Sequence, residues 1–176
     1  MGTDKALLVV DGRPLAVVAA EALRGAGATD VFAVGGDRAG LEAAGLRWVA
    51  DRWPGEGPLG ALVTALDAST ADVVAVLACD MPDVAPAAVE QVLAALDDER
   101  ADAAVATAGG RVHPLLGAYR RAAAPPLRTA FDAGERALLP ALSALSVVEV
   151  GLRQPRWAIN ANRPDDVRVT DRPNRS

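Results

Sequence analysis

The sequence predicts an α/β fold in which helices cover both faces of a mixed, mostly parallel β-sheet. Short valine-rich runs alternate with longer alanine-rich segments of helical spacing, which is typical of stacked strand-helix-strand units. Residues 73–79 include three valines and no polar residue, a pattern typical of a strand buried on both faces. The chain has 176 residues, which suits one domain with a sizeable core. Hydrophobic residues make up 51% and aromatic residues 3%, so this core must consist of small aliphatic side chains.

Each predicted element follows from its local pattern. The apolar run 7–10 is closed by Asp11-Gly12, and apolar residues then recur at helical spacing over 15–23 until Gly25 and Gly27. Only the turn 109–111 separates the runs 103–107 and 115–119, so these are expected to form a hairpin, which makes the sheet mixed. Further strands are expected at 31–34, 46–49 and 147–150, and helices at 58–68, 87–96, 127–131 and 138–145.

Charge and composition exclude several classes of function. A net charge of -5 and a pI near 4.9 argue against nucleic acid or an anionic membrane as a partner. The sequence has no apolar stretch long enough to span a bilayer and no signal-peptide pattern at its start, so a cytoplasmic protein is expected. Cys79 is the only cysteine, and at the end of a buried strand it is expected to be a core residue.

The junction between the apolar run 73–79 and Asp80 is the strongest functional signal. Ligands of open α/β sheets bind beyond the carboxyl ends of the strands, so an acid placed there indicates chemistry. The alternative is that Asp80 caps the helix expected near Pro86 or begins a turn.

Two further features suit a phosphate or nucleotide ligand. Lys5 is the only lysine in a chain whose other basic residues are all arginine, and a compact ammonium group suits phosphates. The alternative is a solvated lysine near a terminus. Gly57 and Gly60 flank Pro58, a residue suited to the first turn of a helix, and glycines let a base or ribose approach the backbone. A plain helix cap would explain this turn equally well.

Six segments, taken together, resemble nucleotidyltransferases of the molybdenum cofactor guanylyltransferase type in order and rough spacing. They are residues 1–8 (MGTDKALL), 57–60 (GPLG), 79–82 (CDMP), 113–117 (HPLLG), 134–136 (GER) and 159–166 (INANRPDD). The resemblance implies a Rossmann-like three-layer αβα nucleotidyltransferase fold over residues 1–169, followed by a flexible tail at 170–176.

The same resemblance implies a reaction and a set of residues. GMP would pass from GTP to molybdopterin or the molybdenum cofactor with release of pyrophosphate, and molybdoenzyme maturation proteins would be further partners. Lys5 would bind the phosphates and Asp80 would hold Mg²⁺, and these two are the expected catalytic residues. The guanine and ribose would lie beside a larger group of residues, namely Asp51, Gly57, Pro58, Leu59 and Gly60.

The acceptor side is expected around Asn160, Asn162 and Arg136. The asparagines lie two residues apart in a strand-like stretch, so both amides would face one side, and the resemblance places them near the metal and the acceptor. The alternative is that they satisfy loop backbone before Pro164. Arg136 would either pair with Glu135 or reach the acceptor phosphate. His113, before Pro114, is expected to have a structural role at the start of a strand.

Two departures from the family pattern stand out. Relatives begin with an apolar strand and a glycine-rich loop before the segment that starts here at Met1. We expect that one wall of the site is missing without them. Either Met1 is an internal methionine of a longer protein, or the chain is a truncated, inactive relative that acts as a noncatalytic binding module. The first is favoured because losing a central strand would expose the edges of its neighbours. Gly35 stands where many relatives have a nucleotide-contacting asparagine, which leaves open a cytidylyltransferase or another small-molecule nucleotidyltransferase.

Overall fold

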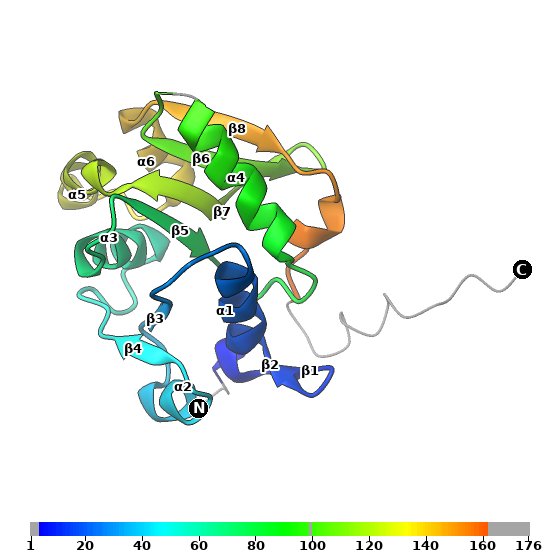
Figure 1. Ribbon diagram of the computed structural model, residues 1–176. Coiled ribbons are helices and arrows are strands. Elements are labelled where there is room, and N and C mark those ends of the chain that lie inside the picture. The colour runs from blue at the N-terminus through cyan, green and yellow to red at the C-terminus, as the bar shows by residue number, and fades with distance from the viewer. Residues whose placement is uncertain (1–3, 99, 162–176) are drawn as a thin grey trace, which may run out of the picture.

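A computed structural model describes residues 4–98 and 100–161 (Figure 1). In chain order the strands are β1 (Val9–Val10), β2 (Arg13–Pro14), β3 (Phe32–Val34), β4 (Arg47–Val49), β5 (Val73–Leu77), β6 (Ala103–Ala108), β7 (Arg111–Arg120) and β8 (Val147–Gly151). The α-helices are α1 (Leu15–Gly25), α2 (Arg38–Ala43), α3 (Pro58–Ala68), α4 (Pro86–Asp98), α5 (Ala124–Asp132) and α6 (Leu138–Ala141). Short 3-10 turns lie at Lys5–Leu7, Arg121–Ala123, Leu142–Ala144 and Pro155–Ala158.

The main sheet has four strands in the order β5-β7-β6-β8. β7 runs antiparallel to both β5 and β6, whereas β6 and β8 are parallel, so β5, β6 and β8 share one direction. The predicted mixed sheet is therefore confirmed. β6 and β7 form the expected hairpin, whose two-residue turn has positive φ at Gly109 and Gly110, as the tight turn of a twisted hairpin requires.

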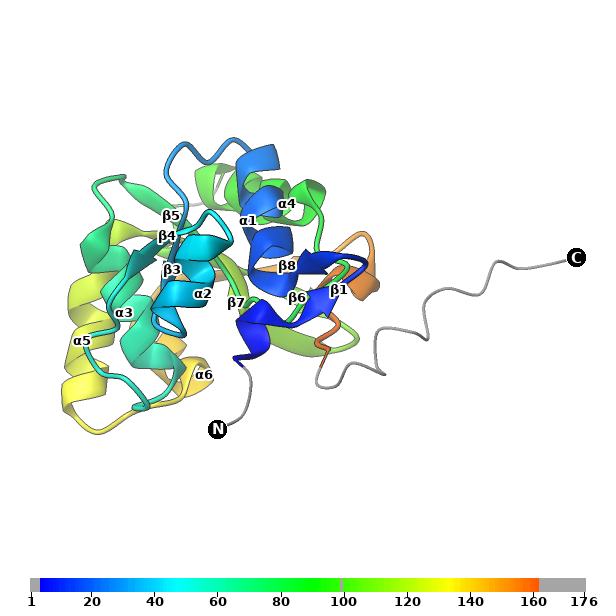
Figure 2. The same ribbon diagram turned by 90° about the horizontal axis from the view of Figure 1, so that it is seen from below.

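Helices cover the sheet on two faces, which gives the expected three layers. α1 and α4 lie on one face, where they pack against Ala104 and Ala106 of β6. α3 and α5 lie on the other face against Ala103 and Val105 (Figure 2). This alternation along β6 is that of a strand whose successive side chains point to opposite faces. Both layers of the core are built mainly from alanine, valine and leucine, as the composition predicts.

β3 and β4 form a separate parallel pair beside the main sheet. Leu41 of α2 and Leu46 pack against Ala16 and Ala20 of α1, so this pair is held to the domain by a small cluster of its own. β3 and β5 both line one cavity, so the edge of β5 that does not bond to β7 faces the smaller pair.

The expectation that the strand 73–79 is buried on both faces was wrong in one respect. All five residues of β5 are only half-buried, although each is apolar. Val73 and Leu77 pack towards α1 and α4, and Val74 and Val76 pack towards α3 and α5. The faces are therefore covered, and the exposure comes from the lateral edge of the strand.

Several boundaries differ from the sequence-based expectation. α2 was not predicted, because its six residues bury only one large side chain, Leu41. β7 begins at Arg111 rather than 115, and α6 covers only part of the helix expected at 138–145. The expected domain end at 169 and the tail 170–176 lie outside the described residues.

None of the helices in the described ranges is both long and apolar enough to cross a bilayer.

Candidate active site

The carboxyl ends of β3, β4 and β5 are followed by Gly35, Asp51 and Asp80, respectively. Asp4 connects the N-terminal segment to this edge, because its Oδ2 accepts a hydrogen bond of 2.7 Å from the backbone N–H of Asp37. Val34 at the end of β3 lines the same cavity as Cys79 and Asp80, which follow β5. The carboxyl ends of β3 and β5 therefore lie at the same edge, where ligands of open α/β sheets bind.

Lys5 lies at this edge in the short 3-10 turn that begins the described chain. The other oxygen of Asp4, Oδ1, accepts a hydrogen bond of 3.0 Å from the N–H of Ala6 and so caps the turn. The exposed side chain of Lys5 lines the same cavity as Cys79 and Asp80. Lys5 and Asp80, the two expected catalytic residues, are thus brought together from segments far apart in the sequence.

Asp80 is positioned by its backbone and has one buried carboxylate oxygen without a partner. Its carbonyl oxygen accepts a 2.7 Å hydrogen bond from the N–H of Ala161. Its Oδ1 is inaccessible to solvent and has no hydrogen-bond partner within the described structure. An unsatisfied buried polar atom costs about 1–3 kcal/mol. Asp80 also lies six residues before α4 begins at Pro86, so it does not cap that helix.

The orphaned oxygen of Asp80 fits a single-carboxylate Mg²⁺ site. No cluster of three or more His, Cys, Asp or Glu side chains suitable for a metal occurs in the part of the chain that the structure describes. Mg²⁺, however, is commonly held by one or two carboxylates together with substrate phosphates and water. Asp80 could supply such a ligand, and the ammonium group of Lys5 lies on the same cavity.

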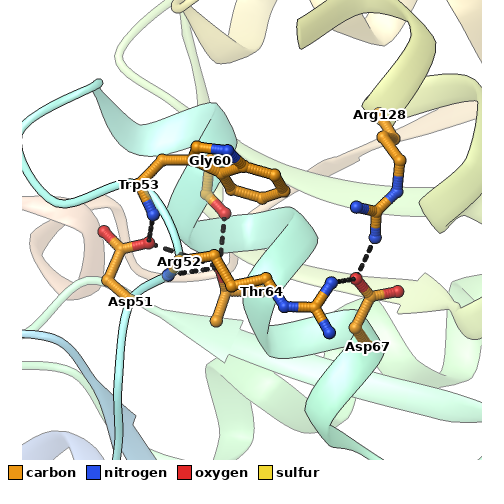
Figure 3. A network of polar contacts seen from close by, with 7 residues as sticks. All are labelled: Asp51, Arg52, Trp53, Gly60, Thr64, Asp67 and Arg128. Carbon is orange, nitrogen blue, oxygen red and sulfur yellow. Dashed lines mark hydrogen bonds and ion pairs between the residues drawn. The ribbon is translucent and has the colours of Figure 1, made fainter. Parts of the chain in front are cut away.

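Asp51 is held in a polar network at the start of the segment 51–57 (Figure 3). Its Oδ1 accepts a 3.1 Å hydrogen bond from the N–H of Trp53 and lies 3.3 Å from the hydroxyl of Thr64. That hydroxyl also lies 2.9 Å from the carbonyl oxygen of Gly60, and it accepts from the N–H of Arg52 at 3.3 Å. One buried hydroxyl therefore joins Asp51 to the first turn of α3.

Ion pairs and ring contacts also hold the segment 51–57 on its solvent-facing side. The carboxylate of Asp67 pairs with Arg52 at 2.8 Å and also with Arg128 of α5 (Figure 3). The guanidinium group of Arg128 lies over the ring of Trp53, which contacts Phe131 at a centroid distance of 4.7 Å. These contacts fix the outer side of the segment against α3 and α5.

The structure requires glycine at both Gly57 and Gly60. Gly57 is the N-cap of α3 with φ of +91°, and Pro58 occupies the first turn, as predicted. A Cβ at Gly57 would lie 3.0 Å from the carbonyl oxygen of Arg136, and one at Gly60 would lie 3.1 Å from Phe131. The side chain of Leu59 is fully buried in the core, so only its backbone could face a nucleotide.

Arg136 contacts the Gly57–Gly60 side of the site. Its Nε pairs with Glu56 at 2.8 Å, and its Nη1 donates to the carbonyl oxygen of Phe131. Its own carbonyl oxygen accepts from the N–H of Leu59. The carboxylate of Glu135 instead accepts from the backbone amides of residues 136 and 137, so the alternative of a Glu135–Arg136 ion pair was wrong.

Of the two asparagines expected on the acceptor side, the structure describes only Asn160. Asn160 is exposed and directly precedes Ala161, whose backbone N–H donates to the carbonyl oxygen of Asp80. Asn160 is therefore one residue away from a contact of Asp80. The expected strand is absent at 160–161, which follow the 3-10 turn Pro155–Ala158 without regular structure. Asn162 lies outside the described residues.

Two residues that were set aside as structural have structural surroundings. Burial, together with the nearby carboxylates of Asp80 and Asp4, raises the pKa of the Cys79 thiol to about 11, so the thiolate is disfavoured at neutral pH. His113 lies near the start of β7, opposite Ala106, and the register shifts at this point, which accommodates Pro114. Neither residue is therefore assigned a role in catalysis.

Sequence reasoning missed Asp4, Thr64 and Asp67. Asp4 and Asp67 are two of many acids in the chain, and Thr64 is one hydroxyl in an otherwise apolar helix. Their partners lie up to 61 residues away in sequence, so no local pattern marks them.

Comparison with known proteins agrees with this geometry. Residues 1–147 match the family described as MobA-like NTP transferase domain. A probable molybdenum cofactor guanylyltransferase of Chloroflexus aggregans is 36% identical, over 96% of this chain and 86% of that protein. The molybdenum cofactor guanylyltransferase of Cereibacter sphaeroides is 33% identical, over 94% of this chain and 86% of that protein.

The solved structures agree as well. Molybdopterin-guanine dinucleotide biosynthesis protein A from Archaeoglobus fulgidus has a TM-score of 0.75 at 25% identity, over 93% of this chain and 87% of that one. A 2-C-methyl-D-erythritol 4-phosphate cytidylyltransferase from Thermus thermophilus has a TM-score of 0.71 at 22% identity, over 93% and 90%, and shows the fold alone.

The three-layer fold and the relatives that match this chain are those of a nucleotidyltransferase. More particularly, the chain belongs to the MobA-like NTP transferase domain family, which confirms the resemblance found in the sequence.

Proposed function

We propose that this protein transfers GMP from GTP to molybdopterin or the molybdenum cofactor, with release of pyrophosphate and with a requirement for Mg²⁺. The names of its relatives support the base and the acceptor. The observation that carries the proposal is the buried Oδ1 of Asp80, which has no partner in the described structure. Asp80 and Lys5 line the same cavity.

The reaction asks little covalent chemistry of the protein. An oxygen of the acceptor's terminal phosphate attacks the α-phosphorus of GTP, the bond between the α- and β-phosphates breaks, and pyrophosphate leaves. The attacking phosphate oxygen is already ionised near neutral pH, so no general base is needed. Positioning and electrostatic stabilisation therefore account for catalysis.

The residues of the site divide these tasks. Lys5 would offset the negative charge of the phosphates, and Asp51 with the Gly57–Gly60 turn would border the base and ribose. Asp80 would hold Mg²⁺, which supplies charge neutralisation at the triphosphate when bound. Asn160, Asn162 and Arg136 would face the acceptor. The hydrogen bond from the N–H of Leu59 to the carbonyl oxygen of Arg136 supports a position for Arg136 beside the base and ribose as well.

The test is a pyrophosphate-release assay on the complete protein, including any residues encoded upstream of Met1. With GTP, molybdopterin and Mg²⁺ we expect turnover, and chelation of the metal should abolish it. Asp80→Ala should lower turnover by about a hundredfold or more, because a metal site of this kind stabilises the transition state by several kcal/mol.

Asp83→Ala is the matched control, because Asp83 is a half-buried acid only three residues further along the chain. It should retain near-parental turnover. Equal turnover in Asp80→Ala and the parent would contradict the metal role. Replacing GTP with CTP, ATP or UTP tests the base, and faster turnover with CTP would favour the cytidylyltransferase alternative that Gly35 leaves open.

A further inference from the structure

Thr64 of α3 is a buried polar residue to which the proposed function gives no role. Its side chain is 2% exposed. A threonine within a helix commonly bonds to the carbonyl oxygen four residues earlier, and the hydroxyl of Thr64 lies 2.9 Å from the carbonyl oxygen of Gly60. If this were its only contact, Thr64 would be a structural residue of the helix and nothing more.

Two further contacts of the Thr64 hydroxyl lead out of the helix to the segment that follows β4. The N–H of Arg52 donates to it at 3.3 Å, and Oδ1 of Asp51 lies 3.3 Å away (Figure 3). A hydroxyl carries one proton and two acceptor sites. It can therefore accept from Arg52 while its proton is shared between the oxygens of Gly60 and Asp51. The bond within the helix requires neither of these outer contacts.

The two oxygens of the Asp51 carboxylate have different surroundings. Oδ1 accepts from the N–H of Trp53 and contacts the hydroxyl of Thr64. Oδ2 has no hydrogen-bond partner among the described residues, and it points away from the network (Figure 3). When the protein fixes one oxygen of a carboxylate, the other oxygen is held in one direction. Oδ2 of Asp51 is thus oriented to accept a hydrogen bond from a ligand.

Gly35 keeps the space beside Oδ2 of Asp51 open. It follows β3, the parallel neighbour of β4, and a Cβ at this position would lie 3.3 Å from the Cβ of Asp51 and 4.0 Å from its Oδ2. The indole N–H of Trp48 donates to the carbonyl oxygen of Gly35 at 2.8 Å and holds this backbone in place. The unpartnered oxygen therefore faces a position that carries no side chain.

We propose that Thr64 is a positioning residue of the nucleotide site. Its hydroxyl holds Oδ1 of Asp51 against the first turn of α3, so that Oδ2 accepts a hydrogen bond from the base or ribose. Thr64 itself touches no substrate. The inference rests on the proposed function, which puts Asp51 and the Gly57–Gly60 turn beside the nucleotide. The phosphates are assigned to other residues, so Thr64 sets the affinity for the nucleotide rather than the rate of the chemical step.

A split between KM and kcat separates this role from a contribution to folding. In the pyrophosphate-release assay of the complete protein, Thr64→Val should raise KM for GTP by about tenfold and leave kcat within about twofold of the parent. Thr64→Ser keeps the hydroxyl and should restore KM to within about twofold of the parent. If Thr64→Val does not fold, Thr64→Ala, which adds no bulk beside the N–H of Arg52, takes its place with the same expectation.

Val63→Ala is the matched control for lost stability. Val63 is the preceding residue of α3, is fully buried in the core, and belongs to the apolar cluster against the sheet. Its truncation weakens the fold but leaves the hydroxyl network intact, so KM should stay within about twofold of the parent. An equal rise of KM in Val63→Ala and Thr64→Val would overturn the inference, because KM would then follow stability alone.

A double-mutant cycle tests whether Thr64 acts through Asp51. In an Asp51→Ala background, Thr64→Val should change KM by less than about twofold, because the carboxylate that it positions is gone. The same tenfold effect in both backgrounds, or an unchanged KM in Thr64→Val alone, would refute the inference. A parent that binds GTP in calorimetry but releases no pyrophosphate would contradict the proposed reaction only, and the same comparisons then apply to the Kd of GTP.

Discussion

The backbone N–H of Ala161 donates a 2.7 Å hydrogen bond to the carbonyl oxygen of Asp80. This bond joins the end of the described chain to the residue that follows β5. It uses only backbone atoms, so it does not depend on the Asp80 carboxylate. The side chain of Asp80 therefore takes no part in this hydrogen bond. Its buried Oδ1 has no partner in the described structure.

The first prediction is that Asp80→Ala does not weaken the fold. Removing a buried oxygen without a partner relieves its desolvation cost, and the bond from Ala161 remains. Urea denaturation of the 176-residue protein should give a free energy of unfolding equal to the parent's or higher, by up to about 1–2 kcal/mol. Asp83→Ala should differ from the parent by less than about 0.5 kcal/mol. A loss of more than about 1 kcal/mol in Asp80→Ala would mean that the carboxylate stabilises the fold.

The second prediction concerns Thr64, whose side chain is 2% exposed. Thr64→Val keeps the shape but leaves the N–H of Arg52 without its partner and removes one contact from Asp51. We expect a loss of about 1–3 kcal/mol in the free energy of unfolding. Thr64→Ser keeps the hydroxyl and loses one methyl group, so it should cost only about 1 kcal/mol. Chemical denaturation of both variants checks this, and a serine variant less stable than the valine variant would show that packing matters more than the hydrogen bonds.

The part of the site that sequence predicts is the part marked by a local pattern. Asp80 is marked because an apolar run stops at an acid, and Pro58 because proline suits the first turn of a helix. No local pattern marks Thr64, a single hydroxyl in an otherwise apolar helix. None marks the Glu56–Arg136 pair either, because its two residues are 80 positions apart in the sequence. The fold follows the same rule. Alternating apolar runs predict the layers. No local pattern marks the open edge of β5, because an apolar run is the same whether its lateral hydrogen bonds are made or not.

The third prediction separates backbone strain from contact at the proposed base and ribose side. Gly55 and Gly57 both have positive φ, +83° and +91°, so an alanine at either position incurs a similar strain of about 1–2 kcal/mol. A Cβ at Gly55 would meet nothing within 4 Å, whereas one at Gly57 would lie 3.0 Å from the carbonyl oxygen of Arg136. Gly57→Ala should therefore be less stable than Gly55→Ala by about 1–3 kcal/mol in urea denaturation. Equal losses would show that Arg136 moves away without cost.

The fourth prediction is that Cys79 resists alkylation at neutral pH. Burial first, and the carboxylates of Asp80 and Asp4 next, raise the pKa of its thiol from 9.0 to about 11. A thiol whose pKa is higher in the folded state stabilises the fold fully below the unfolded pKa. That stability is lost as the pH rises from about 9 to about 11, because the unfolded state then releases the proton first.

The pH dependence of iodoacetamide labelling of the native protein measures this pKa. The labelling rate should rise towards pH 11 rather than near pH 9, the ordinary pKa of this thiol. Asp80→Asn removes one of the two raising charges and should move the midpoint of the profile to lower pH, whereas Asp83→Asn, whose carboxylate is not among the causes of the shift, should leave it in place. A midpoint near pH 9 in the parent protein would mean that the end of β5 is open to water, and the pKa of Cys79 would then report the solvation of this edge directly.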